Sequence, residues 1–193
     1  MYARVATWPA SWEDDEETLV DRALADRAAF AAIYTRYVGR VFQYLLTYAE
    51  SSDDAADLTQ IVFLRAFESL STCRRHRGGT FAGWLFRIAH NAAIDAYRRR
   101  RRTLPWDHLP EAVLPARGPQ PETAAIQHEA LNRLRVLIAE LSAEKQEMLA
   151  LRFAAGLTVA ETAAVLNKSE AAVRKQLSRT VRALKEQFDD YGF

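Results

Sequence analysis

Two amphipathic helices joined by a short turn are predicted near the carboxyl end of the chain, and this pair constrains the fold more than any other stretch. Thr158 is expected to cap the first helix, with Glu161 reaching back to the free backbone amide as in a capping box. The apolar stripe of this helix is made mostly of small side chains, so another helix could pack closely on it: Ala160, Ala163, Ala164 and Leu166. Residues 167–169 break the pattern, and Ser169 is a suitable N-cap for the second helix.

The second helix of this pair is predicted to be basic on its exposed side. Its buried face follows positions i, i+4, i+8 and i+11, which are Val173, Leu177, Val181 and Leu184. The other sides carry Arg174, Lys175, Ser178, Arg179 and Arg182. A short helix, a three-residue turn and a longer basic helix are typical of the helix-turn-helix motif, whose second helix enters the DNA major groove. An ordinary helical hairpin with a solvated basic face fits the same stretch, so the choice depends on the residues upstream.

The composition favours an all-α protein. Of the 193 residues, 49% are hydrophobic, whereas only 7 are glycine and 6 are proline. The formal net charge is +1, but the charge is segregated: residues 13–17 form an acidic run and residues 98–102 are consecutive arginines. Local segregation of this kind matters more for contact with nucleic acid than the net charge does.

Metal, disulfide, membrane and catalytic motifs are not recognisable in the sequence. The one cysteine, Cys73, rules out a disulfide within the chain, and no Cys/His set has the spacing of zinc ligands. There is no basic-then-apolar leader at the amino end, and no apolar run approaches the ~20 residues that span a bilayer. No Gly-rich phosphate loop or Ser/His/Asp set indicates a catalytic site. We therefore expect a cytoplasmic, non-enzymatic protein with no metal, no cofactor and no membrane insertion.

Residues 16–102 are predicted to form a first helical domain, preceded by a loose tail over residues 1–15. The helical period starts at Glu16 and runs to about Tyr48, with a short break near Ala25-Asp26. These stripes are expected to form a core, so no chemistry is assigned to their aromatic side chains.

A further helix is predicted over residues 53–70. The segment Ser51-Ser52-Asp53-Asp54 supplies an N-cap and acidic residues suited to the positive end of the helix dipole. Ile61 lies on the polar side of this helix, away from the apolar stripe. It is either covered by a neighbouring helix or part of a partner-binding surface.

The helix predicted from Phe81 to about Arg101, with Thr80 as its cap, has two distinct faces. Its buried stripe is Phe81, Trp84, Leu85, Ile88 and Ala92. Its polar row is Arg87, Asn91, Asp95, Arg98 and Arg102. Arginine clamps phosphate with two hydrogen bonds and asparagine reads base edges, so this row suits a nucleic-acid surface. A solvated helix end with arginines near the negative end of the dipole is the alternative, but five consecutive arginines exceed that need.

Residues 103–121 hold five of the six prolines and are predicted to be an extended linker. A second helical domain is expected over residues 122–193. It begins with a helix to about Leu141, and Ser142 is expected to cap a helix over residues 143–155 that ends at Gly156. The fold class that follows is all-α, with two small helical domains joined by a Pro-rich linker and the helix-turn-helix in the second.

Four strings of residues, in this order, resemble the sigma-70 family of RNA polymerase sigma factors, in its extracytoplasmic-function (ECF) group. They are FAAIYTRYVGRVFQYL, DAADLTQIVFLRAF, FAGWLFRIAHNAAIDAYRRRRR and LSAEKQEMLALRFAAGLTVAETAAVLNKSEAAVRKQLSRTVRALK. Each string alone is moderately specific, but all four fall in the family's order and cover about Leu24 to Lys185.

The resemblance implies a promoter-specificity subunit that directs promoter recognition, DNA melting and transcription initiation. The first domain would bind the polymerase clamp helices through Asp54, Asp57, Gln60 and Ile61. Its last helix would engage the −10 element of promoter DNA through Arg87, Asn91, Asp95, Arg98, Arg99 and Arg102. The second domain would pack on the polymerase flap and read the −35 element through Ser169, Glu170, Arg174, Lys175, Ser178 and Arg179. Many members of the family are held inactive by an anti-sigma factor, which would be a further partner.

Three departures from the family pattern stand out. Ile61 replaces a common glutamate, which would make the clamp contact more apolar. The second helix of the motif starts Glu170-Ala171-Ala172-Val173-Arg174, where Gly-Thr-Val-Lys is common, and this leaves the −35 preference open. Asn167-Lys168 replaces a glycine and a hydrophobic residue at the turn, but asparagine tolerates left-handed geometry.

Two other classes compete with this prediction. A polymerase-independent regulator with a helical sensing or dimerising domain would also carry a C-terminal helix-turn-helix. Such a sensor does not need the Phe81–Arg102 helix, which adds a second basic surface. A hydrolytic or metal enzyme would need a site assembled from distant residues, since no local motif supplies one.

Overall fold

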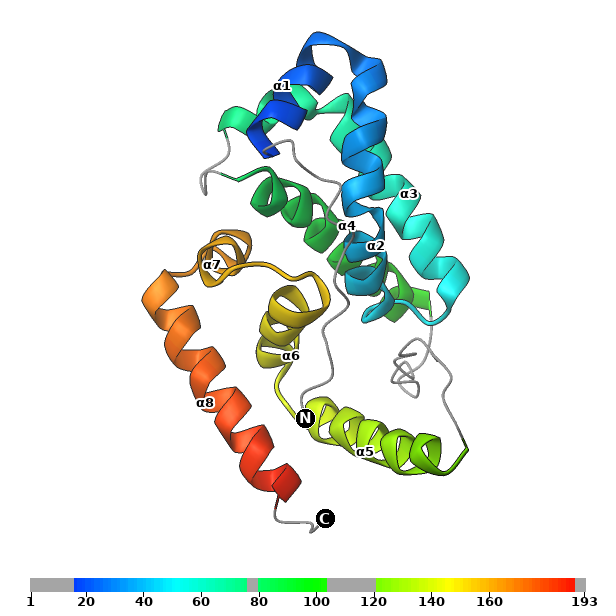
Figure 1. The fold of residues 1–193 in the computed structure, drawn as a ribbon, viewed down its shortest axis with the longest axis vertical. Coiled ribbons are helices and arrows are strands. Elements are labelled where there is room, and N and C mark those ends of the chain that lie inside the picture. Colours follow the sequence, from blue (N-terminus) through cyan, green and yellow to red (C-terminus); the bar gives the residue numbers. More distant parts are fainter. Residues whose placement is uncertain (1–15, 76–79, 104–120, 190–193) are drawn as a thin grey trace.

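The computed structural model describes residues 16–75, 80–103 and 121–189, and these form helices without any strand (Figure 1). The first unit comprises α1 (Glu16–Ala25), a 3₁₀ turn (Arg27–Ala29), α2 (Phe30–Leu46), α3 (Ser52–Glu68), a second 3₁₀ turn (Leu70–Arg75) and α4 (Phe81–Thr103). The second unit comprises α5 (Pro121–Ala139), α6 (Ala143–Leu149), the π-helical turn η3 (Ala150–Ala154), α7 (Val159–Leu166) and α8 (Glu170–Asp189). The all-α prediction is confirmed, while the predicted tail and the interior of the predicted linker lie outside the described residues.

Local capping explains where the helices of the first unit begin. The predicted break after Ala25 is confirmed, because the Asp26 carboxylate accepts a hydrogen bond from the Ala28 amide at 2.9 Å and starts a separate turn. Ser51 caps α3 by accepting from the Asp54 amide at 3.0 Å. Thr80 caps α4 in the same way, accepting from the amide of Gly83, the third residue of the helix, at 3.1 Å.

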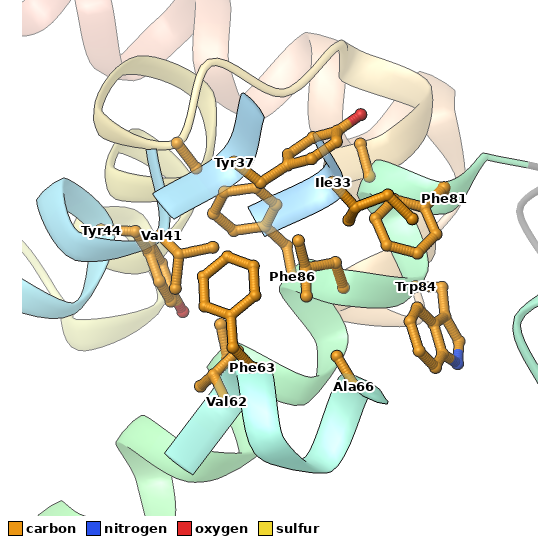
Figure 2. Packing of buried hydrophobic residues seen from close by; sticks show 14 of the residues in the cluster. Ile33, Tyr37, Val41, Tyr44, Val62, Phe63, Ala66, Phe81, Trp84 and Phe86 are labelled. Atoms are coloured by element: carbon orange, nitrogen blue, oxygen red, sulfur yellow. The ribbon is translucent and has the colours of Figure 1, made fainter. Parts of the chain in front are cut away.

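Aromatic side chains fill the core of the first unit. Figure 2 shows Phe86 of α4 between the side chains of α2 and α3, and Phe86 is fully buried. Its ring meets that of Tyr44 edge-on, with the centroids 5.8 Å apart. Edge-to-face contacts of this kind add to the stabilisation from burial alone. The predicted stripe of α4 is confirmed, except that Ile88 is only partly buried.

Glu16 joins the start of α1 to the start of α4, a contact that periodicity does not predict. Its carboxylate accepts hydrogen bonds from the Tyr37 hydroxyl and from the Ala82 amide, the latter at 2.9 Å. The amide is one of the unsatisfied donors in the first turn of α4, where negative charge is favourable. Burial raises the pKa of Tyr37 far above its usual value, and the Glu16 charge raises it further.

The second unit contributes side chains to two cores. Its own core holds Leu137, Met148, Leu149, Ala163, Val173, Leu177 and Leu184. The core of the first unit also includes Leu151, Ala155, Leu157 and Val165, which come from η3, the following turn and α7. The two units are therefore packed together, with α7 against α4 and η3 against α2.

Two predictions for the second unit are wrong in detail. Ser142 occupies the N-cap position of α6 with extended backbone, but its side chain makes no capping hydrogen bond. The helix predicted over residues 143–155 changes from α to π geometry at Ala150. Gly156 does end this helix, with a left-handed φ of +67° that suits glycine.

Candidate nucleic-acid and polymerase interface

The helix-turn-helix has the predicted local geometry. The Thr158 hydroxyl accepts from the Glu161 amide at 3.1 Å, and the Glu161 carboxylate accepts from the Thr158 amide at 2.7 Å. Asn167 ends α7 in the left-handed conformation, with φ 54° and ψ 42°. Ser169 then accepts from the Ala172 amide at 3.2 Å and caps α8. The turn is therefore specified by its own residues.

The buried face of α8 differs from the prediction at one position. Val173, Leu177 and Leu184 are buried, but Val181 is 42% exposed and Thr180 takes its place at 5%. At 100° per residue, Thr180 lies close to the line through Val173 and Leu177, whereas Val181 lies at the edge of that face.

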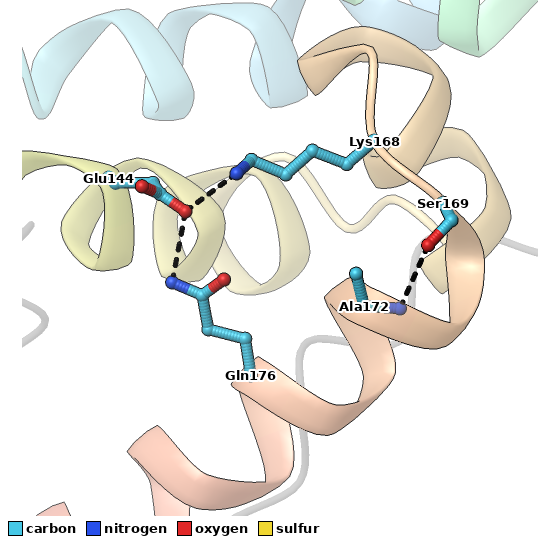
Figure 3. Close-up of polar contacts among 5 residues, drawn as sticks. All are labelled: Glu144, Lys168, Ser169, Ala172 and Gln176. Carbon is cyan, nitrogen blue, oxygen red and sulfur yellow. Dashed lines mark hydrogen bonds and ion pairs between the residues drawn. The ribbon is translucent and has the colours of Figure 1, made fainter.

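Glu144 of α6 contacts both the turn before α8 and α8 itself, as Figure 3 shows. Its carboxylate accepts from the Lys168 ammonium at 2.7 Å and from the Gln176 side-chain amide at 3.1 Å. The hydrogen bond from Lys168, and then that from Gln176, lower the pKa of Glu144. These contacts set the orientation of α8 relative to α6, and the sequence does not predict them.

All six residues predicted to read the −35 element lie exposed on α8 or at its cap: Ser169, Glu170, Arg174, Lys175, Ser178 and Arg179. The Arg174 guanidinium is paired with the Glu170 carboxylate one turn earlier. The structure thus places these residues over 169–179, on sides of α8 that no part of the described chain covers.

A second polar face runs along α4. Arg87, Asn91, Asp95 and Arg98 are exposed and lie within about 80° of one another around the helix, next to the buried stripe. Arg99 and Arg102 belong to the same helix, but their side chains lie outside the described residues. Tyr97, which is not among the predicted site residues, is 46% exposed on the same helix. The sequence pattern that could have predicted Tyr97 as a site residue is an aromatic side chain on the polar side of an amphipathic helix.

A third exposed face lies on α3. Asp57 and Gln60 are exposed, Asp54 is half-buried, and Ile61 is 38% exposed. The alternative that a neighbouring helix buries Ile61 is therefore wrong for this structure. Leu64, three residues further along the same face, is 59% exposed and extends the apolar patch.

Residues 16–75, 80–103 and 121–189 contain no group of three or more His, Cys, Asp or Glu side chains placed to hold a metal ion. None of the helices in these ranges is long and apolar enough to cross a membrane.

Two family models match the chain in order. Sigma-70 region 2 matches residues 33–103, and sigma-70 region 4 matches residues 131–184. The chain belongs to the sigma-70 family of RNA polymerase sigma factors. Region 2 includes the exposed faces of α3 and α4, and region 4 includes the helix-turn-helix.

Curated relatives and solved structures agree with this assignment. The ECF RNA polymerase sigma factor BldN of Streptomyces coelicolor is 34% identical over 171 residues, which are 86% of this chain and 63% of BldN. The structure of CnrH in complex with the cytosolic domain of CnrY has a TM-score of 0.66 at 25% identity, covering 93% of this chain and all of that chain. RpoE from Bartonella quintana, solved with the anti-sigma factor NepR, has a TM-score of 0.61 at 20% identity, covering 81% of this chain and 94% of that one. The likeness to RpoE is one of fold.

Proposed function

We propose that this sigma-70 chain is the promoter-specificity subunit of a bacterial RNA polymerase, directing promoter recognition, DNA melting and transcription initiation. The observation that carries the proposal is the order of regions 2 and 4 on two helical units, with exposed polar residues on α3 and α4 of the first unit and on α8 of the second. The polymerase would perform the chemistry of transcription. Arginine-rich faces supply phosphate contacts, and asparagine or arginine at the same faces supplies base readout.

The roles of the faces follow from their chemistry. The α4 face, Arg87 to Arg102, would track the −10 element, because melted DNA needs a basic surface along its backbone. The α8 face, Ser169 to Arg179, would read the −35 element in the major groove. The α3 face, from Asp54 to Ile61, would bind the clamp helices, and the first two helices of the second unit, α5 and α6, would bind the flap. The corresponding domain limits are residues 16–102 and 122–193, joined by residues 103–121.

An anti-sigma factor is part of this proposal as a second protein partner. The support is that RpoE, which shares the fold, was solved with the anti-sigma factor NepR. The half-exposed side chains Ile61 and Leu64 on α3 would give such a protein an apolar surface to cover. The corresponding assay measures whether a candidate anti-sigma factor competes with core polymerase for binding to this chain.

The deciding experiment combines purified core polymerase with this chain in a pull-down, followed by in vitro transcription from a genomic fragment library. We expect stable binding and new transcripts that start downstream of shared −35 and −10 sequences. Absence of binding would overturn the proposal and favour a polymerase-independent DNA-binding regulator.

The division of labour can be tested with Arg98→Glu/Arg99→Glu in the full chain. Reversed charge on the α4 face should abolish promoter opening, because the non-template strand would be repelled, while polymerase binding is retained. The matched variant Arg182→Glu/Lys185→Glu makes the same change of charge at two exposed residues towards the end of α8, outside the residues predicted to contact either promoter element. Equal loss of polymerase binding and of opening in the α4 variant would contradict the assignment.

A further inference from the structure

The exposed side of α8 is centred on a short row of residues. Four side chains of this helix are buried, with at most 8% of their surface exposed: Val173, Leu177, Thr180 and Leu184. At about 100° per residue, they lie within about 60° of one another around the helix axis. Four exposed residues of the first three turns lie within about 50° of the opposite direction, and we call these the outer row: Ala171, Lys175, Ser178 and Arg179. DNA that approaches α8 from its exposed side meets the outer row first.

The sides of α8 that flank the outer row carry contacts within the chain. On one side the Glu170 carboxylate is paired with the Arg174 guanidinium. On the other side the Gln176 side-chain amide donates to the Glu144 carboxylate of α6 at 3.1 Å, as Figure 3 shows. Ala172 lies one turn before Gln176, so it is exposed but belongs to the side of α8 that faces α6. The outer row is therefore the part of α8 best placed to enter a DNA groove.

Ala171 is the first residue of the outer row and lies in the first turn of α8. Residues at this end of a recognition helix contact the base edges in the major groove. Its side chain is a single methyl group, so contact with a polar base edge would remove water from hydrogen-bonding groups without replacing it. The C5-methyl of thymine is the one apolar group that the major groove presents. Ala171 therefore favours a thymine at the position it meets.

Lys175 lies one turn after Ala171 in the outer row. Four residues advance the helix by ~6 Å, which is about one or two base pairs at ~3.4 Å per base pair. The Lys175 ammonium donates hydrogen bonds and accepts none, so it matches guanine, whose N7 and O6 are both acceptors. The spacing thus combines an apolar contact at one base pair with a charged hydrogen bond at a nearby one.

We propose that Ala171 and Lys175 set the base preference of this chain at the −35 element. A thymine methyl packs on the Ala171 side chain, and a guanine about one or two base pairs away accepts hydrogen bonds from Lys175. The proposal deepens the proposed function and rests on it for the identity of the DNA element. Arg179, at the edge of the outer row, adds a phosphate contact that holds α8 in the groove without reading sequence.

The first test is selection of bound sequences from a random duplex library by the full chain, alone and in complex with core polymerase. Wild type should enrich a thymine and a guanine at a fixed spacing of about one or two base pairs. Ala171→Gly should lose the thymine preference and keep the guanine, whereas Lys175→Ala should do the reverse. Ala172→Gly is the matched control: it removes the same methyl from the adjacent exposed residue, and it should keep both preferences.

The second test removes the methyl group from the DNA instead. Deoxyuridine differs from thymidine only in lacking the C5-methyl. At the selected position, this replacement should weaken wild-type binding about fourfold in a competition assay, the factor that corresponds to burying one methyl-sized group. It should leave the affinity of Ala171→Gly unchanged, and the same replacement at a thymine outside the selected positions should affect neither protein. Equal weakening of both proteins at the selected position would overturn the proposal.

The outcomes of these tests distinguish the base readout from the proposed function. Selection of the thymine and guanine by the chain alone, with no binding to core polymerase, would support the base readout and overturn the promoter-specificity role. Polymerase-dependent transcription from promoters whose selection does not change in Ala171→Gly or Lys175→Ala would do the opposite. Absence of any selected sequence, with or without polymerase, would overturn the base readout.

Discussion

The exposed side chain of Arg174 forms an ion pair in the free chain that a DNA phosphate can replace. In the free chain its guanidinium is paired with Glu170 one helical turn away. An exposed pair of this kind contributes only about 0.2–1 kcal/mol, so DNA phosphate can replace the carboxylate at little cost. Glu170 also keeps the guanidinium at the start of α8, where it faces the major groove in the proposed complex.

Arg174→Ala and Arg179→Ala should each weaken binding to duplex DNA that contains the −35 element. If the lost contact is to phosphate, the slope of log affinity against log salt should become shallower by about one unit. Fluorescence anisotropy over a range of salt concentrations measures both quantities. Lys185→Ala, further along α8, is the control and should change neither. Unchanged affinity would place the substituted arginine off the DNA.

The ionisation of Tyr37 should make the free energy of unfolding depend on pH in the alkaline range. Its folded pKa is raised by burial and by Glu16, so the folded chain favours the neutral phenol more strongly than the unfolded chain does. This contribution is fully present below the unfolded pKa of about 10 and is lost as the pH rises beyond it. We expect urea unfolding midpoints to fall above that pH, and to fall less steeply for Tyr37→Phe. An identical pH dependence in the two proteins would rule out this role.

At the scale of elements, the turn between α7 and α8 depends on one backbone conformation. Asn167 is the one non-glycine residue with positive φ in the described ranges, and Lys168 next to it is tied to Glu144. A left-handed residue with a Cβ costs roughly 1–2 kcal/mol, less for asparagine because its side chain bonds locally. The angle between the two helices is therefore sensitive to this position.

Asn167→Ala should lower the free energy of unfolding by about 1 kcal/mol, whereas Asn167→Gly should be nearly neutral because glycine adopts positive φ freely. Urea denaturation followed by circular dichroism measures the difference. A larger loss for glycine than for alanine would show that the asparagine side chain, rather than the backbone conformation, holds the turn.

At the scale of the whole molecule, the shared core couples the stability of the two units. Leu157 belongs to the second unit by sequence but is fully buried in the core of the first. Leu177 is buried in the core of the second unit. A substitution at Leu157 therefore tests the packing of the first core, and a substitution at Leu177 tests the packing of the second.

Leu157→Ala should lower the free energy of unfolding by about 2–5 kcal/mol and speed hydrogen exchange in α2 and α4 as well as in α7. Leu177→Ala should affect α6 and α8 more strongly than α2. Hydrogen exchange read by mass spectrometry separates the two patterns. If Leu157→Ala left α2 and α4 unchanged, the units would be independent in solution.

The sequence by itself determined the parts of this protein that depend on neighbours in the chain. The caps at Ser51, Thr80 and Thr158 and the left-handed turn at Asn167 were all predictable, because each needs only residues three or four positions apart. The exposed rows on α4 and α8 were predictable for the same reason, since helical periodicity sorts side chains by face.

The tertiary structure alone decided which helix faces meet. The burial of Ala89 and Ala93, the Arg40 hydrogen bonds to Ala155 and Gly156, and the Glu16 contact with α4 join residues far apart in sequence. Small side chains along one helix are compatible with packing against any close neighbour, so periodicity cannot choose the partner. That choice depends on the shape and chemistry of both surfaces together, and only the folded chain brings them into contact.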